Sequence, residues 1–329
     1  MRNFIPHPMQ SIEWENALNK LGMETVRIYE KSTGSSAISY LIHFREIPFT
    51  NLKIGYLSRS LWPGEESLNN IYTEAKKREC IFIKIEPEEI TGSESLKTVP
   101  KNYLVPGKKF LYEWTIDLDL AKSSELLFSN LKPATRRNIK IAQKNGIYIR
   151  EMTSLKGFEI LYKLYRETIL KKGFSGYDYN YLKTLFLAMT EKIAYIFIAY
   201  YNNIPLAAYE IFLWNKKLYY PLGGTSKYFS SSRASYLLMW EVIQFGKKME
   251  ALYFDMWGCL GPDSFKEGHP WYGLTRFKLG FGGSLRHYPN SFDLVINPEI
   301  YYKYDFINVF INQLKESGIL ISDRKYNLV

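Results

Sequence analysis

Hydrophobic and polar residues alternate in short runs along the second half of the chain. Residues 193–222 read IAYIFIAYYNNIPLAAYEIFLWNKKLYYPL, in which the polar turns YNN and NKK separate three apolar stretches. Apolar runs of this length, bounded by turn residues, are typical of buried β-strands. A helical pattern follows over about residues 233–249, and the run LYFDMW comes directly after it. The pattern predicts an antiparallel meander, a helix and one further strand.

The N-terminal half shows the same order of elements. The runs ETVRIYEK, AISYLIHFREI and KIGYLSR precede a helical pattern over about residues 64–79, which leads into the run IFIKIEP. Where helix meets strand, KKRECIFIKIEP in the first half resembles KKMEALYFDMWG in the second. The sequence therefore predicts two copies of one α/β (α+β) unit, each a mostly antiparallel meander sheet covered by helices.

The length of the chain also favours two domains. Its 329 residues exceed what one hydrophobic core usually serves. We expect a first domain over residues 1–145 and a second over 146–295. The run INPEIYYKYDFINVFINQLKES reads as a terminal helix, and we expect the segment 296–329 to return and complete the first domain.

Between the two copies lies a helix with an unusual charge pattern. A proline in the first turn and a glycine after the end predict a helix over about residues 132–145. No Asp or Glu occurs between Glu125 and Glu151. Cations recur on one helical face, and apolar residues point to another: Arg136, Lys140 and Lys144 on the first, Ile139 and Ala142 on the second. A solvated face is the ordinary interpretation, but the missing acids favour a phosphate-bearing ligand.

Composition narrows the classes of function. The formal net charge of +10 and pI near 9.2 favour acidic partners such as nucleic acid, phosphorylated substrates or an anionic membrane surface. Cys80 and Cys259 are the only cysteines, so no disulfide framework is expected, and a reducing cytoplasm is the simplest compartment. The four histidines are scattered, which makes a metal site improbable. We find no long apolar segment and expect neither secretion nor membrane spanning. The paired glycines at 223–224 and 282–283 are interpreted as turns.

Several motifs together resemble the FemABX-type aminoacyl-tRNA-dependent peptidoglycan transferases. They run in order through nearly the whole chain: QSIEW (10–14), IKIEP (83–87), RRNIKIAQKNG (136–146), YYPLGGTS (219–226), SYLLMWE (235–241), YFDMWG (253–258) and RFKLGFGG (276–283). The resemblance implies a tandem pair of GNAT-like domains. It also implies transfer of an amino acid from aminoacyl-tRNA to the side-chain amine of the stem peptide in a peptidoglycan precursor.

The resemblance further implies the partners and the location. Aminoacyl-tRNA would be a co-substrate, with no other cofactor, and the acceptor would be either UDP-MurNAc-pentapeptide or a lipid II type precursor. The enzyme would act as a monomer in the cytoplasm, with peripheral contact at the inner face of the plasma membrane left open. The polyanion on the basic helix would be either the tRNA or the diphosphate of the precursor.

This sequence departs from the family pattern at three places. The long helical arm that some relatives carry in the second domain is missing, because YIFIAYYNNIPLAAYEIF passes straight through that point. In the substrate-binding stretch GFSGYDYNYL, Tyr177 stands where relatives often have arginine, and Tyr181 is the matching tyrosine. Leu18 stands where a lysine is expected, and Lys20 lies nearby.

The candidate catalytic residues are Lys278 and Asp255. The resemblance places Lys278 at the active centre, where a cation can balance charge that develops on an ester carbonyl. The alternative is a surface lysine at a strand edge. We expect Lys278 to act in the chemistry or in holding substrate, and not to hold the fold together. Aminolysis also needs a deprotonated amine, for which Asp255 is one candidate base and Glu86 is another. Structural capping is the competing role of both.

Candidate binding residues complete the list. Arg137 is predicted to contact phosphate, because a guanidinium binds phosphate bidentately and a lysine cannot. Glu86 and Tyr181 are expected to bind substrate. Three further tyrosines are expected to line the sugar or peptide groove, namely Tyr220, Tyr228 and Tyr236. The alternative is that these tyrosines are core residues.

Two other functions fit parts of the sequence. An acyl-CoA-dependent GNAT-like N-acyltransferase would share the fold, although the usual [QR]-x-x-G-x-[GA] pyrophosphate loop is missing from the sequence. A non-catalytic nucleic-acid-binding protein would use the basic helix, although no recognised binding motif accompanies it.

Overall fold

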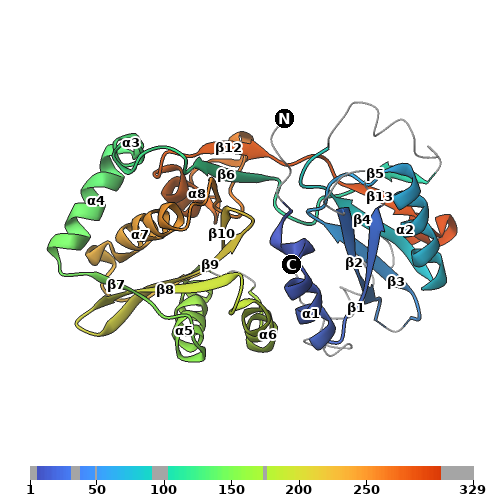
Figure 1. The fold of residues 1–329 in the computed structure, drawn as a ribbon, viewed down its shortest axis with the longest axis horizontal. Coiled ribbons are helices and arrows are strands. Elements are labelled where there is room, and N and C mark those ends of the chain that lie inside the picture. The colour runs from blue at the N-terminus through green and yellow to red at the C-terminus, as the bar shows by residue number, and fades with distance from the viewer. Residues whose placement is uncertain (1–5, 31–37, 49, 91–102, 173–175, 305–329) are drawn as a thin grey trace. The chain divides into compact units, whose positions relative to one another are not determined.

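The computed structural model describes residues 6–30, 38–48, 50–90, 103–172 and 176–304. The chain divides into two compact units, of which unit 1 comprises Met1–Leu111 with Tyr288–Val329, and unit 2 comprises Tyr112–His287. Each unit is a sheet with helices packed on it (Figure 1). The predicted α/β fold class is therefore confirmed.

The described part of unit 1 is built on a six-stranded sheet of order β1-β2-β3-β4-β13-β5. Its strands are β1 (Glu24–Glu30), β2 (Ile38–Glu46), β3 (Lys53–Ser58), β4 (Cys80–Glu86), β5 (Leu104–Pro106) and β13 (Phe292–Val295). A 3₁₀ turn and two helices accompany them: Pro8–Gln10, α1 (Ile12–Lys20) and α2 (Glu65–Lys77). Neighbouring strands are antiparallel except for β3 and β4. Residues of the sheet and of α2 share an apolar core, and Ile47, Ile54, Ile81 and Phe82 form a second cluster.

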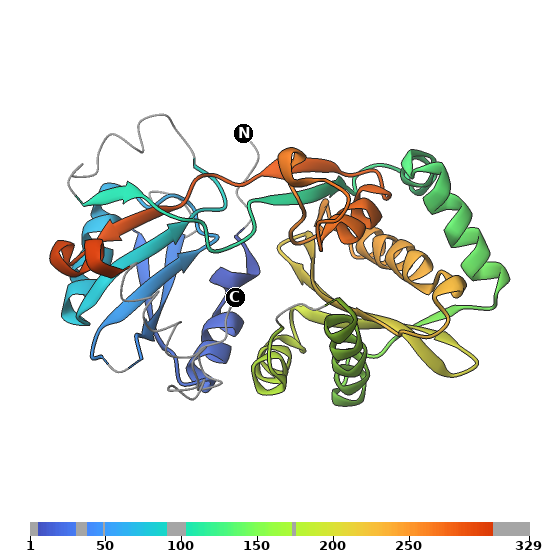
Figure 2. The same cartoon turned by 180° about the vertical axis from the view of Figure 1, so that it is seen from behind.

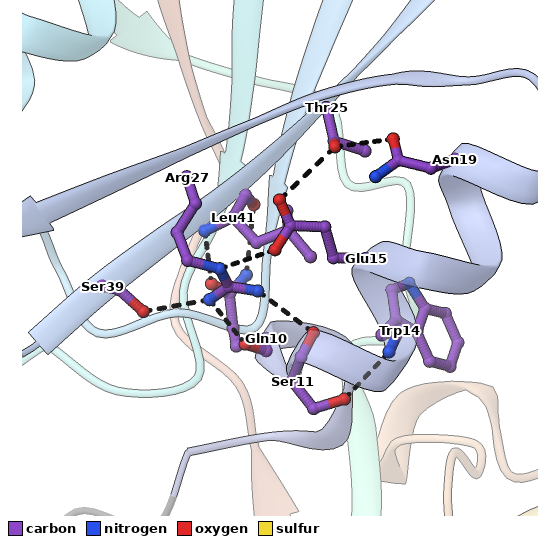
Figure 3. A network of polar contacts seen from close by, with 9 residues as sticks. All are labelled: Gln10, Ser11, Trp14, Glu15, Asn19, Thr25, Arg27, Ser39 and Leu41. Atoms are coloured by element: carbon purple, nitrogen blue, oxygen red, sulfur yellow. Dashed lines mark hydrogen bonds and ion pairs between the residues drawn. The ribbon is translucent and has the colours of Figure 1, made fainter. Parts of the chain in front are cut away.

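A polar network ties α1 to the sheet of unit 1 (Figure 3). The guanidinium of Arg27 on β1 donates from Nε to Glu15 Oε2 at 2.7 Å and from Nη1 to Gln10 O at 2.9 Å. The buried side chain of Gln10 accepts from Leu41 N at 2.8 Å and donates to Ser58 O at 2.7 Å. Gln10 thereby satisfies a buried backbone N–H of β2 and a partly buried backbone carbonyl of β3.

The described part of unit 2 contains a seven-stranded sheet of order β12-β6-β11-β10-β9-β8-β7. Its strands are β6 (Trp114–Asp119), β7 (Tyr148–Glu151), β8 (Ala194–Tyr201), β9 (Ile204–Trp214), β10 (Lys217–Thr225), β11 (Tyr253–Asp255) and β12 (Ser284–His287). Its α-helices are α3 (Ser124–Asn130), α4 (Pro133–Lys144), α5 (Leu155–Lys172), α6 (Tyr179–Met189), α7 (Ala234–Lys248) and α8 (Tyr272–Leu279). Short 3₁₀ turns occur at Ser230–Ser232 and Pro262–Ser264. Helices α5 and α6 lie on one side of the sheet, and α7 lies on the other (Figures 1 and 2).

The predicted meander in unit 2 is confirmed, and its turns explain why the strands end where they do. Asn202 and Asn203 connect β8 to β9 with φ of 46° and 64°, and Asn215 and Lys216 connect β9 to β10 with φ of 47° and 58°. Two successive positive φ values define the type I′ turn, whose twist matches the flanking strands and which asparagine tolerates well.

The predicted repeat of elements is also confirmed. In both units a meander leads through a helix into a strand that pairs parallel with the last meander strand, β3 with β4 and β10 with β11. The helix ends correspond as well, since Glu79 after α2 and Glu250 after α7 both have φ of 54°. The short match KKREC and KKMEA therefore marks equivalent positions in the two units.

The expected boundaries at residues 145 and 296 differ from the observed division. Strand β6 pairs with β11 and β12, so residues from Tyr112 onward belong to unit 2. Strand β13 lies between β4 and β5, so the return to unit 1 begins at Tyr288. The strands that pair with β6 and β13 are far from them in the sequence. No local sequence pattern therefore shows to which unit each strand belongs. Residues 298–304 are helical, and the rest of the predicted terminal helix lies outside the described residues.

The paired glycines have two different roles. Gly282 has φ of 82°, as expected for a turn. The interpretation of residues 223–224 as a turn is wrong, because both lie within β10. A Cβ atom on Gly224 would lie 2.2 Å from the backbone nitrogen of Tyr165 on α5. Glycine at this position therefore allows a helix to approach the strand closely.

The Gln10 network leads to a prediction about stability. Gln10→Ala should lower the free energy of unfolding by about 1–3 kcal/mol, since it leaves Leu41 N buried without its acceptor. Urea unfolding of the two proteins measures this difference. The control is Asn19→Ala at an exposed position of the same network, expected to change it by less than about 0.5 kcal/mol. Equal effects of the two substitutions would contradict the role assigned to Gln10.

Candidate functional site

In unit 2 the parallel strands β10 and β11 lie side by side over only three residues. The paired segments are Lys217–Tyr219 and Tyr253–Asp255. Beyond them, β10 continues along β9 to Thr225. The chain after β11 instead follows β6, where Met256 N donates to Ile116 O at 3.0 Å. The two strands therefore separate at their carboxyl ends.

The corresponding strands of unit 1 stay together. β3 and β4 pair from Lys53 to Ser58. The pairing continues beyond them, because Arg59 N donates to Glu86 O at 2.7 Å and Glu88 N donates to Ser60 O at 2.7 Å. Since ligands in α/β sheets commonly bind where the carboxyl ends of strands separate, the candidate site lies in unit 2.

Lys278 lies at this separation. The residue belongs to α8, and its side chain is buried with 2% of its surface exposed. Its Nζ donates to Trp257 O at 3.1 Å and to Gly258 O at 2.6 Å, two carbonyls that follow β11. On the other side, Nζ lies 5.5 Å from the ring centroid of Tyr220 on β10. The alternative of a surface lysine at a strand edge is therefore wrong, because Lys278 is helical and enclosed.

The burial of Lys278 determines its charge state. Burial lowers the pKa of Lys278 to about 8, although Cys259 and Asp255 oppose the shift. The ammonium form therefore still predominates at neutral pH. Two of its N–H groups donate to backbone carbonyls, so Lys278 also helps to stabilise the fold. This structural role was not predicted from the sequence. An ammonium removed from water acts strongly on nearby negative charge, because solvent does not screen it.

Asp255 is the centre of an ion-pair network on the sheet of unit 2. Its carboxylate accepts from Thr115 Oγ1 at 2.5 Å and from Trp257 N at 2.8 Å. Arg286 and Lys217 lie 2.8 Å and 3.4 Å from its Oδ2. Burial alone would raise the pKa of Asp255, but these two cations and the hydrogen bonds hold it well below its usual range. Such a carboxylate is a weak base, and its contacts fit an anchoring role better than the predicted proton transfer.

The predicted tyrosines lie in three different settings. Tyr220 is buried, 4.5 Å from the ring of Tyr209, and burial raises its pKa well above the usual value. Tyr236 on α7 packs against Phe277, the neighbour of Lys278, with ring centroids 5.1 Å apart. Tyr228 is 61% exposed on the segment after β10. Tyr220 therefore lies beside the Lys278 ammonium, and Tyr236 packs on the residue next to Lys278.

The remaining predicted residues lie on other elements. Glu86 ends β4 in unit 1 and accepts from Phe110 N at 2.7 Å, which is a structural contact. Tyr181 on α6 stacks on Tyr177 at 5.0 Å. Leu18, at the position of the expected lysine, is a buried core residue of α1.

Arg137 is exposed on the basic helix α4. Ile139 and Ala142 are buried in the core of unit 2, as their predicted face requires. Together with its neighbours on α4, Arg137 lines a hollow of about 400 Å³.

Sequence reasoning missed Glu210 and the partners of Asp255. Glu210 lies on β9 and is 5% exposed, and its Oε1 has no hydrogen-bond partner among the described residues. Burial raises the pKa of Glu210 to about 8. Its signal was available, because it is the single acid in the apolar run PLAAYEIFLW. Arg286 and Thr115 come from distant strands and carry no local signal.

The described residues show neither a metal centre nor a membrane-spanning helix. They contain no group of three or more His, Cys, Asp or Glu side chains arranged to hold a metal ion. Among the helices that can be described, none is both long enough and apolar enough to cross a membrane.

Comparison with a profile of the FemAB family adds the deciding observation. The profile matches residues 107–204 and 199–309, together more than half of the 329 residues. The chain belongs to the FemAB family. The matched part of this FemAB chain includes the basic helix, the separated strands and Lys278.

Among sequence relatives of this FemAB chain is the aminoacyltransferase FemA of Staphylococcus aureus (strain MW2). The two are 28% identical over 103 residues, which make up 31% of this chain and 24% of FemA. The match thus spans about a quarter of the length of that relative.

Solved structures resemble this FemAB chain over most of its length. A crystal structure of FemX superimposes with a TM-score of 0.77 at 18% identity, covering 92% of this chain and 95% of FemX. The C-terminal domain of a putative lysylphosphatidylglycerol synthetase from Agrobacterium fabrum superimposes with a TM-score of 0.59 at 12% identity. The match covers 94% of this chain and 92% of that domain. A tandem GNAT protein from the clavulanic acid biosynthesis pathway gives 0.51 at 10% identity, with 84% of each chain covered. These likenesses confirm the predicted tandem GNAT-like fold.

The raised pKa of Glu210 leads to a prediction about pH and stability. Between its ordinary value of 4.5 and about 8, the folded FemAB chain keeps a proton that the unfolded chain releases. Raising the pH through this window should therefore lower the free energy of unfolding, by at most about 1.4 kcal/mol per pH unit from this group.

Glu210→Gln removes that proton equilibrium and should flatten the loss. Denaturant unfolding at pH 5, 6, 7 and 8 measures it. The exposed Glu191→Gln serves as the control and should leave the slope unchanged. A slope that Glu210→Gln does not alter would contradict the prediction.

Proposed function

We propose that this chain is an aminoacyltransferase of peptidoglycan synthesis. It transfers an amino acid from aminoacyl-tRNA to the stem-peptide amine of a peptidoglycan precursor, with no further cofactor. Membership of the FemAB family supports this function, as does the match to an aminoacyltransferase, FemA. The acceptor is UDP-MurNAc-pentapeptide or its lipid II type form. The enzyme acts in the cytoplasm as a monomer, and contact with the inner face of the plasma membrane accompanies a lipid-linked acceptor.

The observation that carries the proposal is the buried ammonium of Lys278 between the separated strands. In the transfer, the acceptor amine attacks the ester carbonyl carbon of the aminoacyl-tRNA, and the carbonyl oxygen gains negative charge. The C–O bond to the tRNA ribose then breaks and an amide forms. The proton lost by the amine is taken up by the ribose oxygen, which leaves as a hydroxyl. Lys278 already directs two N–H groups at backbone carbonyls. Its third N–H is the donor that stabilises the oxyanion.

The aromatic surroundings of Lys278 support the same assignment. Tyr220, Tyr236 and Phe277 limit the access of water to the ammonium, and in a dry site a fixed donor stabilises developing charge most strongly. Asp255 is then a positioning residue, because its bond to Trp257 N orients the segment whose carbonyls hold Lys278.

The donor can be tested with the wild-type protein. Incubation with total aminoacyl-tRNA and either acceptor form should add the mass of an amino acid to the stem peptide, as measured by mass spectrometry. Ribonuclease treatment of the donor mixture should abolish the product. A product that survives ribonuclease and requires acyl-CoA would instead establish the acyl-CoA-dependent N-acyltransferase. The absence of product with either donor would favour the third function, that of a non-catalytic nucleic-acid-binding protein.

The role of Lys278 leads to a second test. Lys278→Met should lower the transfer rate by roughly 100-fold to 1,000-fold at saturating substrates, which is typical of the loss of one oxyanion donor. The wild-type rate should fall as pH rises through about 8, because the ammonium loses its proton there. The residual rate of the variant should lack that falling limb. Stopped assays between pH 6 and 9 measure both effects.

The matched control for Lys278→Met is Lys247→Met. Lys247 also donates to two backbone carbonyls, those of Leu120 and Lys122, at a different place in unit 2. Both substitutions remove similar bonds, so both should lower stability modestly, by about 1–2 kcal/mol. The control should keep the transfer rate. Equal rates in the two variants would reduce Lys278 to a structural lysine.

A further inference from the structure

The exposed face of α4 carries cations that pair with no acid in the described part of the chain. Arg137, Lys140 and Lys144 are exposed, and none of them forms an ion pair with the described residues. Arg136 differs from them, because its Nη1 donates to Ser129 O at 2.6 Å and also to the carbonyl of Leu131. We define the α4 face as Arg137, Lys140 and Lys144, and regard Arg136 as partly structural.

The α4 face borders a hollow of about 400 Å³. Its lining comes entirely from one helix: Pro133, Arg136, Arg137, Lys140, Ile141 and Lys144. The hollow therefore extends along the helix axis. Neighbouring cations repel one another and destabilise the helix unless an anion lies between them. A hollow lined in this way suits an extended anionic chain.

We propose that the α4 face binds the sugar-phosphate backbone of RNA. This inference rests on the proposed function, in which the RNA is the donor tRNA. Contacts from Arg and Lys to phosphates need no base sequence, so one surface accepts tRNAs that differ in sequence.

The length of the α4 face favours RNA over the diphosphate of a precursor. Arg137 and Lys144 are seven residues apart, which corresponds to about 10 Å along a helix that rises 1.5 Å per residue. A nucleic acid strand presents one phosphate about every 3.4 Å along its axis, so three phosphate-to-phosphate intervals match this length. A diphosphate offers only two adjacent phosphates and would leave part of the face without a partner.

The composition of the same face argues against a lipid bilayer as its partner. Helices that lie in a membrane interface combine basic residues with a broad exposed apolar face. The apolar residues that line the hollow are Pro133 and Ile141, whereas Ile139 and Ala142 are buried in the protein core. The surface therefore offers charge without a hydrophobic anchor.

The position of α4 connects this surface to Lys278. Lys132 N donates to Gly280 O at 2.9 Å, so the start of α4 is bonded to the segment that ends α8. A Cβ on Gly280 would lie 2.4 Å from Thr135 Oγ1, which shows how closely the two helices meet. Lys278 precedes Gly280 by two residues. An RNA strand along α4 therefore has one end beside the helix that carries the candidate active centre.

Direct binding tests the inference without any transfer assay. Fluorescence anisotropy with labelled, deacylated tRNA is measured from 0.05 to 0.3 M salt, for the wild type and the variant Arg137→Gln, Lys140→Gln, Lys144→Gln. Loss of three phosphate contacts should lower the slope of log affinity against log salt by about 2–3 units. The affinity at 0.1 M salt should fall by roughly 100-fold.

A matched control removes the same charge elsewhere in unit 2. Lys156, Lys163 and Lys171 are exposed on α5, where Glu159 and Glu167 lie among them. Changing the three lysines to Gln should alter the salt slope by less than one unit. Equal losses in the two triple variants would overturn the inference, because net charge alone would then explain binding. An unchanged affinity of the α4 variant would overturn it as well.

Two further probes separate the other anions. If the α4 variant loses binding to phosphatidylglycerol vesicles and keeps its affinity for tRNA, the face is a membrane contact and the inference is wrong. If pyrophosphate at constant ionic strength displaces tRNA from the wild type and from the α5 control but not from the α4 variant, the face is a diphosphate site and the inference is wrong. Binding of tRNA that depends on α4 without any transfer would reject the proposed function alone.

Discussion

Strands β10 and β11 leave each other after three paired residues, and the polar chemistry of unit 2 depends on this separation. Both sides are fixed, one by the ladder with β9 and the other by hydrogen bonds to β6. Asp255, at the last paired position, joins four strands through Thr115, Lys217 and Arg286. Because an uncompensated buried carboxylate would be costly, this network makes the separation point rigid. In unit 1 the equivalent strands stay paired, so the same arrangement of elements leaves no such opening.

The separation also makes it possible to bury Lys278. An ammonium without water needs acceptors, and a closed ladder would already have used the carbonyls of Trp257 and Gly258. Once the strand has turned away from β10, those carbonyls accept from Nζ. The same two bonds that stabilise the charge also fix its position, which is what a donor to a developing oxyanion requires. In the proposed function, one side chain therefore has both a structural and a catalytic role.

The sequence predicted those features that local interactions determine. The hairpins follow from Asn202 and Asn215 at positive φ, and the faces of α4 follow from the helical spacing of its cations and of Ile139. Features that depend on distant partners were not predictable. The membership of β6 in unit 2 comes from its pairing with β11, more than 100 residues later in the chain. The cations around Asp255 lie on other strands, and Arg286 is 31 residues away. The burial of Lys278 belongs to the same class, because nothing in RFKLGFGG reveals what will cover it.

The exchange of single strands between the two halves of the chain affects how such a protein can change. β6 is an interior strand of unit 2 but precedes the rest of that unit, and β13 is an interior strand of unit 1 but follows the whole of unit 2. A cut at the middle of the sequence would remove an interior strand from each sheet and expose the edges of its neighbours. The two copies therefore cannot be shuffled, duplicated or inherited as consecutive segments. Once the repeat had formed, selection had to act on both copies as a single unit.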